Sequence, residues 1–328
     1  MKLDTIQLKT HTGYLQDFDR SRFNHARIKK VNDLVVDNYS LAVKSFGMES
    51  LNVNETFDFV ALQVNSKILK DQYSEGITIN TLERLLAEVS ALGVKLDPSF
   101  LEDCDLKRID VADDISVTAP ASSYFNSLNH LIAPKFYKTT YDSGIVFKEK
   151  IASQKLYTTF YSKESPSIQD KRFFKEYAKA ALGFKNKIRM ETKLSTAGTI
   201  KKYLSTSTLP EILQDTTLNA VAFDKIINGQ LDFPGSITAE NLTLTEEKHL
   251  IYAQYLFSFY KGDHKRIVEH VKRKVPSKTG TYYQLRQIER FLSILSNSKD
   301  SSIHANIEEV KSGIGNLPQQ KLQQNASK

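Results

Sequence analysis

The chain has 328 residues, of which 40% are hydrophobic and 25% charged, a composition typical of a globular protein long enough for two domains. Its net charge of +7 favours partners that carry phosphate, such as nucleic acid. No apolar run reaches the roughly 18 residues of a membrane span, the N-terminus lacks an apolar signal core, and the single cysteine, Cys104, excludes an internal disulfide. The sequence therefore predicts a cytoplasmic protein without a membrane span.

The first hundred residues predict strands and one helix. Residues 3–9 and 57–64 alternate apolar and polar side chains, as a strand with one buried face does. Residues 10–55 are polar and irregular apart from a strand-like segment at 27–37. Over 79–92, leucine and valine recur at the spacing of one helix face.

Acidic residues interrupt the strand predicted over 107–116, KRIDVADDIS. Because side chains alternate between the two faces of a strand, one face is shared by Arg108, Asp110, Ala112 and Asp114. Ile109 and Val111 point to the core, and a bulge would exchange Asp113 for Asp114. Two carboxylates on a buried face cost free energy unless they are compensated, and the candidates for this are a divalent metal ion and Arg108.

Two later strands also place polar residues on one face. A predicted β-hairpin joins residues 139–148 to 154–163, and one face of its second strand holds Tyr157, Thr159, Tyr161 and Lys163. After a helical stretch at 171–182, one face of the strand at 187–194 holds Lys187, Arg189, Glu191 and Lys193. An ordinary amphipathic strand explains any one of these patterns, whereas three in one chain indicate a shared polar site.

Beyond residue 199 the pattern becomes helical. Short helices are predicted up to residue 227, followed by a linker at 232–238 and by longer helices at 243–260, 263–273, 280–296 and 303–312. Residues 243–328 hold 14 Lys and Arg against 8 Asp and Glu, a net charge of +6. The basic partner surface is therefore expected to be C-terminal.

The predicted fold class is α+β. Residues 1–203 are expected to form a mostly antiparallel sheet domain with helices, and residues 204–314 a smaller, basic, all-α domain that binds DNA or has an accessory role. Residues 315–328 are expected to be a disordered tail because they are polar and lack apolar periodicity.

Several common catalytic motifs are absent from the sequence. The seven histidines are scattered, with no H-x-H pair and no H-E-x-x-H, which disfavours two-histidine nucleases and zinc hydrolases. No G-x-x-x-x-G-K-[ST] loop occurs either, so opening of a DNA duplex would depend on supercoiling or on a separate helicase.

Three short motifs follow one another along the polar strands: R-x-D-x-A-x-D at 108–114, Y-x-K within FYSKE at 160–164, and R-x-E-x-x-L at 189–194. Over roughly residues 55–205 the chain resembles the rolling-circle replication initiators of the filamentous-phage gene II/X type. These are related to staphylococcal-type plasmid Rep proteins and to conjugative relaxases. The resemblance implies a metal-dependent, site-specific endonuclease that nicks one strand of origin DNA, stays attached to the 5′ end through tyrosine and leaves a 3′-hydroxyl primer.

The resemblance also implies roles for particular residues. Tyr161 would be the nucleophile and Lys163 the cation beside it, because a phenol with a pKa of about 10 needs such help at neutral pH. Asp110, Asp114 and Glu191 would hold Mg²⁺ or Mn²⁺, which prefer oxygen ligands. The expected partners are supercoiled or single-stranded origin DNA and a host helicase and polymerase, in the cytoplasm of a bacterial host cell.

Alternatives to these assignments stay open. Tyr157 shares the strand face of Tyr161 and could be the nucleophile or a second one, and Glu164 could be a metal ligand. The same chemistry would serve a conjugative relaxase. A catalytically silent protein that binds DNA through basic C-terminal helices, with structural carboxylates, would also fit the charge distribution.

Overall fold

A computed structural model of the chain describes residues 1–328 apart from 30–34, 43–44, 132, 134, 151–155, 165–169, 205–207, 216, 228–242, 261–262, 275–277, 298–304 and 315–328. Its strands are β1 (Leu3–Thr10), β2 (Leu15–Phe18), β3 (Phe23–Lys29), β4 (Val35–Leu41), β5 (Met48–Asn54), β6 (Phe59–Asn65), β7 (Val94–Leu96), β8 (Asp105–Ser116), β9 (Phe136–Tyr141), β10 (Gly144–Glu149), β11 (Tyr157–Tyr161) and β12 (Lys187–Leu194).

The α-helices are α1 (Leu82–Ala91), α2 (Phe100–Asp103), α3 (Ala121–His130), α4 (Lys171–Glu176), α5 (Ala178–Leu182), α6 (Ala197–Leu204), α7 (Leu209–Gln214), α8 (Leu218–Ile227), α9 (Leu244–Phe259), α10 (His264–Lys274) and α11 (Lys278–Asn297), and residues 305–314 are also helical. Short 3-10 segments are η1 (Thr12–Tyr14), η2 (Arg20–Arg22), η3 (Ser66–Glu75) and η4 (Ile79–Thr81).

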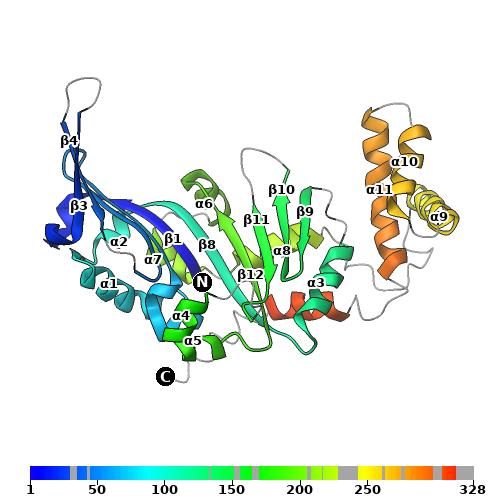
Figure 1. The fold of residues 1–328 in the computed structure, drawn as a ribbon. Coiled ribbons are helices and arrows are strands. Elements are labelled where there is room, and N and C mark those ends of the chain that lie inside the picture. The colour runs from blue at the N-terminus through cyan, green and yellow to red at the C-terminus, as the bar shows by residue number, and fades with distance from the viewer. Residues whose placement is uncertain are drawn as a thin grey trace.

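Ten of the described strands form one antiparallel sheet in the order β3-β4-β5-β6-β1-β8-β12-β11-β10-β9, and β2 pairs with β7 separately (Figure 1). The large sheet consists of two halves with the same strand arrangement. β1 pairs with β6, the last strand of the meander β3 to β6, and β8 pairs with β12, the last strand of the meander β9 to β12. β1 and β8 pair with each other at the centre, so the N-terminal residues lie beside the acidic strand.

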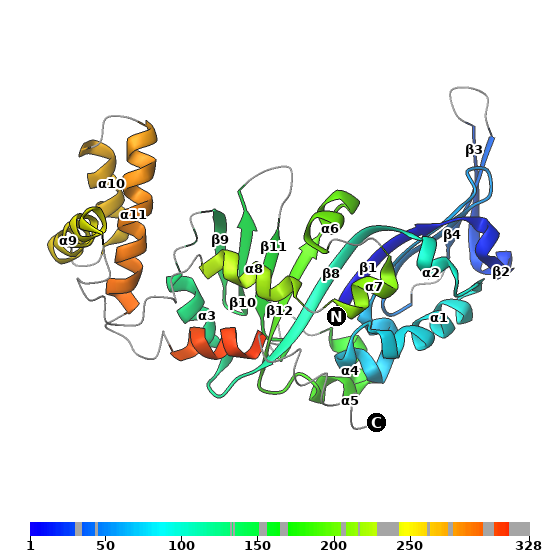
Figure 2. The same cartoon turned by 180° about the vertical axis from the view of Figure 1, so that it is seen from behind.

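Helices cover one face of the second half of the sheet, as Figure 2 shows for α3, α8 and the helix at 305–314. Strand residues on this face are apolar and buried, including Ile188, Met190 and Phe160. The Phe160 ring packs edge-on against Phe223 of α8, with ring centroids 5.9 Å apart. Because alternate residues of β8, β11 and β12 point into this core, the residues between them point to the opposite face.

Helices α9, α10 and α11 have a hydrophobic core of their own, built from Ala253, Leu256, Ile267, Val271, Ile288, Phe291 and Leu292. In contrast, α6, α7, α8 and the helix at 305–314 belong to the core of the sheet, through buried residues such as Ile212, Phe223 and Val310. The boundary expected between residues 203 and 204 thus falls inside α6, and α6 shares one core with α7.

The expected α+β class with a mostly antiparallel sheet and C-terminal helices is confirmed. The strand at 187–194 has the predicted bounds, and the helices at 244–259, 264–274 and 278–297 lie close to the predicted ones.

Two segments differ from the prediction. Residues 10–55, expected to be irregular apart from a strand-like segment at 27–37, contain β2 to β5, and β3 and β4 overlap the two ends of that segment. In strand β3 the side chains of residues 24–27 are exposed on both faces, so no apolar alternation marks this segment in the sequence. The strand expected at 139–148 is two strands, β9 and β10, with a turn at Asp142 and Ser143, residue types that favour turns. The linker expected at 232–238 and the tail expected at 315–328 lie outside the described residues.

Candidate active site

The polar faces of the central strands border a cavity of about 250 Å³ on the side of the sheet away from α8. Thirteen residues line it: Asp4, Thr5, Glu49, Asn65, Lys67, Tyr73, Arg108, Asp110, Tyr161, Lys163, Asp170, Phe174 and Glu191. They come from β1, β5, β6, β8, β11 and β12, from η3 and α4, and from the segments that follow β11 and precede α4. The sheet order therefore gathers residues that are up to 187 positions apart in sequence.

Asp4 reaches this cavity because of a β-bulge. The register between β1 and β8 shifts by one residue between Leu3 and Thr5, so Asp4 and Thr5 both line the cavity although they are neighbours in sequence. The Asp4 carboxylate accepts hydrogen bonds from Lys163 at 3.1 Å and from Arg189 at 2.5 Å. Burial alone would raise the pKa of Asp4, but these two cations outweigh it and hold the pKa well below its usual range.

Arg189 lies beneath the cavity and is 1% exposed. Its Nε and Nη2 donate to the two oxygens of Asp114 at 2.7 and 2.8 Å, and Lys2 makes a further ion pair with Asp114. Burial would raise the pKa of Asp114, yet Arg189 and Lys2 hold it well below its usual range. Asp114 is therefore a fully paired carboxylate with two cationic partners.

Lys163 lies two residues beyond the end of β11 and is 6% exposed. Its ammonium donates to Asp4 and to the hydroxyl of Tyr73, and lies 4.3 Å from the Tyr73 ring centroid. Burial and the nearby Arg189 lower the pKa of Lys163 to about 8. The aromatic rings of Tyr73 and Phe184, the latter 5.2 Å from the ammonium, exclude water from this side of the cavity.

Tyr161 and Glu191 form the second functional pair. The Tyr161 hydroxyl donates to Oε2 of Glu191 at 2.7 Å. Burial and the neighbouring Asp4 raise the pKa of Glu191 to about 7, and burial together with Glu191 raises the pKa of Tyr161 well above its usual value. At neutral pH the phenol is thus protonated and hydrogen-bonded to a carboxyl group that can accept its proton.

Asp110 lies on the same face and is 2% exposed. Arg108, two residues earlier, donates to both of its oxygens, with Nε at 2.9 Å from Oδ1. Burial raises the pKa of Asp110 in spite of this partner. Arg108 is therefore the compensating cation that the sequence offered as an alternative to a metal ion.

The structure brings four of the predicted site residues together, because Asp110, Tyr161, Lys163 and Glu191 all line the cavity. Asp114 lies next to it, in the ion pair with Arg189.

Tyr157 is 38% exposed at the far end of β11 and does not line the cavity. Asp113 faces the helices, where it accepts a hydrogen bond from Asn219 of α8 at 2.8 Å. Glu164 accepts a hydrogen bond from the backbone amide of Asn186 at 3.2 Å. Strand β8 therefore presents Asp110 and Asp114 to one face of the sheet and Asp113 to the other.

Metal binding at this cavity would rest on Asp110 and Glu191, the two predicted ligands that line it. Both offer the carboxylate oxygens that Mg²⁺ and Mn²⁺ prefer. Asp114 does not fit the role of a ligand here, because it does not line the cavity and is ion-paired with two cations, Arg189 and Lys2. Within the described ranges, no three His, Cys, Asp or Glu side chains gather as a metal-holding group.

No protein-family model matches the sequence, and no curated protein matches it. Among solved structures, the chain is similar to the di-domain ARO/CYC BexL from the BE-7585A biosynthetic pathway. The TM-score is 0.24 and the sequence identity is 9%, over 59% of this chain and 73% of that one.

None of the helices that the structure describes has the length and apolar character needed to cross a membrane.

Sequence reasoning missed Asp4 and Tyr73, and it did not assign a role to Arg189. Asp4 is a carboxylate inside an apolar strand, the same signal that drew attention to 107–116, but the bulge that turns it toward the cavity leaves no mark in the sequence. Tyr73 lies in η3, whose irregular backbone, with Lys70 at φ 57°, has no periodicity to read.

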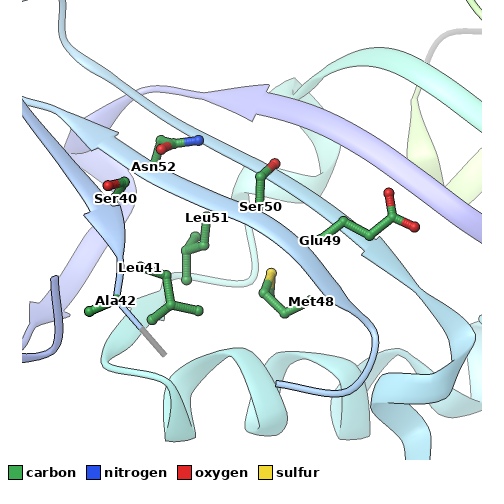
Figure 3. Close-up of a pocket in the computed structure, with 8 residues that line it drawn as sticks. All are labelled: Ser40, Leu41, Ala42, Met48, Glu49, Ser50, Leu51 and Asn52. Atoms are coloured by element: carbon green, nitrogen blue, oxygen red, sulfur yellow. The ribbon is translucent and has the colours of Figure 1, made fainter. Parts of the chain in front are cut away.

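A second cavity, of about 320 Å³, lies where β4 and β5 separate beyond the pairing of Ser40 with Asn52. Figure 3 shows Leu41, Met48 and Leu51 on the side of the sheet where a helix lies, and Ser50 and Asn52 on the other side. Glu49 lines both cavities. The second cavity holds no paired nucleophile and base among its lining residues, so the first is the better candidate for chemistry.

Proposed function

We propose that this protein is a replication initiator that nicks one strand of origin DNA, with Tyr161 as nucleophile. The observation that supports the proposal most directly is the hydrogen bond from the Tyr161 hydroxyl to the half-buried Glu191 carboxyl group, beside the Lys163 ammonium. A nucleophile that contacts its base and lies near a cation is the arrangement expected for transfer of a phosphoryl group to a side chain.

Each residue has a defined task in this reaction. Glu191 takes the phenolic proton as the Tyr161 oxygen forms a bond to phosphorus, and the bond from phosphorus to the 3′ oxygen breaks. Lys163, whose ammonium lies 5.9 Å from the Tyr161 ring centroid, offsets the charge that builds on the phosphate and supplies a proton to the departing 3′ oxygen. The products are a 5′-phosphotyrosyl link and a free 3′-hydroxyl, so atoms and charge balance without any oxidant or reductant.

Asp110 and Glu191 are the residues that would hold Mg²⁺ or Mn²⁺ at the cavity, Glu191 through the oxygen that does not accept the hydrogen bond from Tyr161. When bound, such an ion would polarise a phosphoryl oxygen and neutralise part of the charge of the transition state. Tyr73 holds the Lys163 ammonium through its hydroxyl and therefore acts as a positioning residue.

The decisive experiment incubates the protein with supercoiled DNA from its own genetic neighbourhood in the presence of Mg²⁺ and looks for protein covalently bound to the 5′ end of the nick. Tyr161→Phe should abolish the adduct while folding and DNA binding survive, because only a hydroxyl is removed. Tyr157→Phe is the matched control and should leave the adduct intact.

Peptide mapping of the digested adduct identifies the attachment site. A phosphotyrosyl peptide that contains Tyr157, or a tyrosine outside residues 156–163, would refute the assignment to Tyr161. A gel shift without any nick would instead support a DNA-binding protein without catalysis.

A further inference from the structure

The open face of strands β9 to β12 carries a regular pattern of tyrosine and lysine. The strand registers place Tyr137 opposite Lys148, Lys148 opposite Tyr157, and Tyr157 opposite Lys193. Directly opposed residues of antiparallel strands point to the same face, so these four side chains form one row across four strands. The row alternates an aromatic ring with an ammonium group.

A second row, four residues further along β11, leads to the candidate active site. Tyr141 of β9 lies opposite Gly144, and Gly144 lies opposite Tyr161. A Cβ added at Gly144 would lie 2.3 Å from the backbone oxygen of Phe160, so glycine is required where β10 and β11 approach each other. Tyr161 thus belongs both to this row and to the lining of the cavity.

This face is open to solvent, whereas the other face of the same strands is the buried core. Tyr137 is 62% exposed, Tyr141 58% and Tyr157 38%. Phe147 and Phe160, which point the other way, are fully buried. In Figure 1, β10, β11 and β12 lie in front of α8, so the face that points away from α8 is the one that carries the rows.

The charge of the open face suits one class of ligand. Among the outward-pointing residues of these four strands, all of which the structure describes, Glu191 at the active site is the carboxylate and the other charged residues are lysine or arginine. Exposed aromatic rings interleaved with cations bind single-stranded nucleic acid, because unpaired bases stack on the rings and phosphates pair with the cations. In a duplex the base faces are stacked on one another and are not available to the rings.

We propose that the face formed by Tyr137, Tyr141, Tyr157, Lys148 and Lys193 binds the single strand of DNA that is cleaved at Tyr161. The identity of the strand rests on the proposed function, whereas binding of a single strand by this face does not. The strand would lie across β9 to β12 with its bases on the rings, and one phosphate would enter the cavity at Tyr161.

Binding is measured with the full-length protein and a fluorescent oligothymidylate of about 15 nucleotides, a length within the site sizes of single-strand binding folds. The buffer contains EDTA, and the readout is fluorescence anisotropy. The double variant Tyr137→Ala, Tyr157→Ala should raise the Kd roughly 5- to 150-fold for each lost stack. Tyr137→Phe with Tyr157→Phe keeps both rings and should bind within about twofold of the unaltered protein on the same stacking argument.

Two controls separate the face from other exposed groups. Tyr255→Ala removes a tyrosine that is 55% exposed on α9 and should not change the Kd for the oligonucleotide. Lys148→Gln with Lys193→Gln should make the slope of log K against log salt shallower by about 1.4, since each phosphate contact on a single strand contributes about 0.7. A matched duplex should show no response to the tyrosine substitutions.

Unchanged oligonucleotide binding by the double alanine variant would overturn the proposal. An equal rise in Kd for the double alanine and the double phenylalanine variants would also overturn it, because loss of the aromatic rings would then not be the cause of the weaker binding. If these variants weaken binding but the unaltered protein forms no covalent adduct, the binding face stands and the proposed nickase falls. If the adduct forms and the variants bind the oligonucleotide normally, the proposed nickase stands and the binding face is refuted.

Discussion

Lys163 and Glu191 have pKa values that burial moves toward neutrality from opposite sides. Burial lowers the pKa of the lysine to about 8 and raises that of the glutamate to about 7. Groups with such pKa values transfer protons efficiently near neutral pH. In the proposed reaction Glu191 must be ionised to accept a proton and Lys163 must be charged to stabilise the phosphate.

The rate of adduct formation is therefore expected to have a bell-shaped dependence on pH. It should rise as the pH increases through about 7, where Glu191 loses its proton, and fall as the pH increases through about 8, where Lys163 loses its charge. Single-turnover rates across pH 5 to 10 measure this. Glu191→Gln should be slow throughout and lose the acidic limb. A flat profile between pH 6 and 9 would contradict the roles of both residues.

Asp110→Asn tests the metal. The amide keeps the shape of the side chain but removes the charge that a divalent cation prefers. Nicking should fall by at least about tenfold, because metal polarisation supplies several kcal/mol. Thermal unfolding is measured alongside, since the variant also removes the charge that pairs with Arg108, and nicking is compared at a temperature at which both proteins are folded. A Mg²⁺ titration of nicking is the measurement. Normal nicking at low Mg²⁺ would count against Asp110 as a ligand, and Asp105→Asn, on the exposed start of β8, is the control.

The central strands are joined through buried charges. Arg189 of β12 pairs with Asp114 of β8 and with Asp4 of β1, so three adjacent strands share one ion-pair network. Removing one partner of such a network leaves an uncompensated charge in the interior. This network lies directly beneath Tyr161, which is paired with Arg189 in the strand register.

Asp114→Ala should therefore destabilise the fold by about 3–5 kcal/mol, the usual cost of breaking a buried ion pair. Asp105→Ala, on the same strand, breaks the exposed pair with Lys107 and should change stability little, because water screens such pairs. The midpoints of urea unfolding compare the two variants with the unaltered protein. Similar midpoints for both variants would show that the buried pair does not stabilise the sheet.

The buried apolar residues of the described chain form three clusters: the sheet core, the core of α9 to α11, and a smaller cluster that includes Tyr73, Phe173 and Phe184. The helix at 305–314 returns to the sheet, where Ile307, Val310 and Ile314 are buried and Glu309 accepts a hydrogen bond from Tyr124. The helices α9 to α11 thus lie, in sequence, between segments that belong to the sheet core. A chain that ends near residue 203 would lack α7, α8 and this helix, and would expose the apolar face that they cover.

Helix α10 is the most basic of the three and is expected to contribute to duplex binding. Its exposed cations are Lys265, Arg266, Lys272, Arg273 and Lys274, with Glu269 as the one acidic residue of the helix. Changing all five to glutamine should weaken binding to duplex DNA, and the salt slope should become shallower by about 0.9 for each phosphate contact that is lost. Glu269→Gln is the control and should not weaken binding. An unchanged salt slope would move the duplex-binding surface away from α10.

Local sequence was sufficient to predict which side chains share a strand face. Alternation is a property of each strand alone, so the polar faces of 107–116, 156–163 and 187–194 could be read before any pairing was known. For the same reason Tyr161 and Glu191 do meet, once β11 and β12 lie side by side, whereas Lys163 lies two residues beyond the end of β11. The helical C-terminal region was predicted on the same local basis, from its 3.6-residue periodicity.

The partners of those side chains depend on strand order and on the bulge, which the tertiary structure decides. Asp114 was expected to bind metal, but β1 and β12 place Lys2 and Arg189 against it. Asp4 and Tyr73 join Lys163 only because residues 4, 73 and 163 are brought together by the central pairing of β1 with β8 and by the path of η3. Such contacts between distant residues follow from long-range packing, and no local periodicity records them.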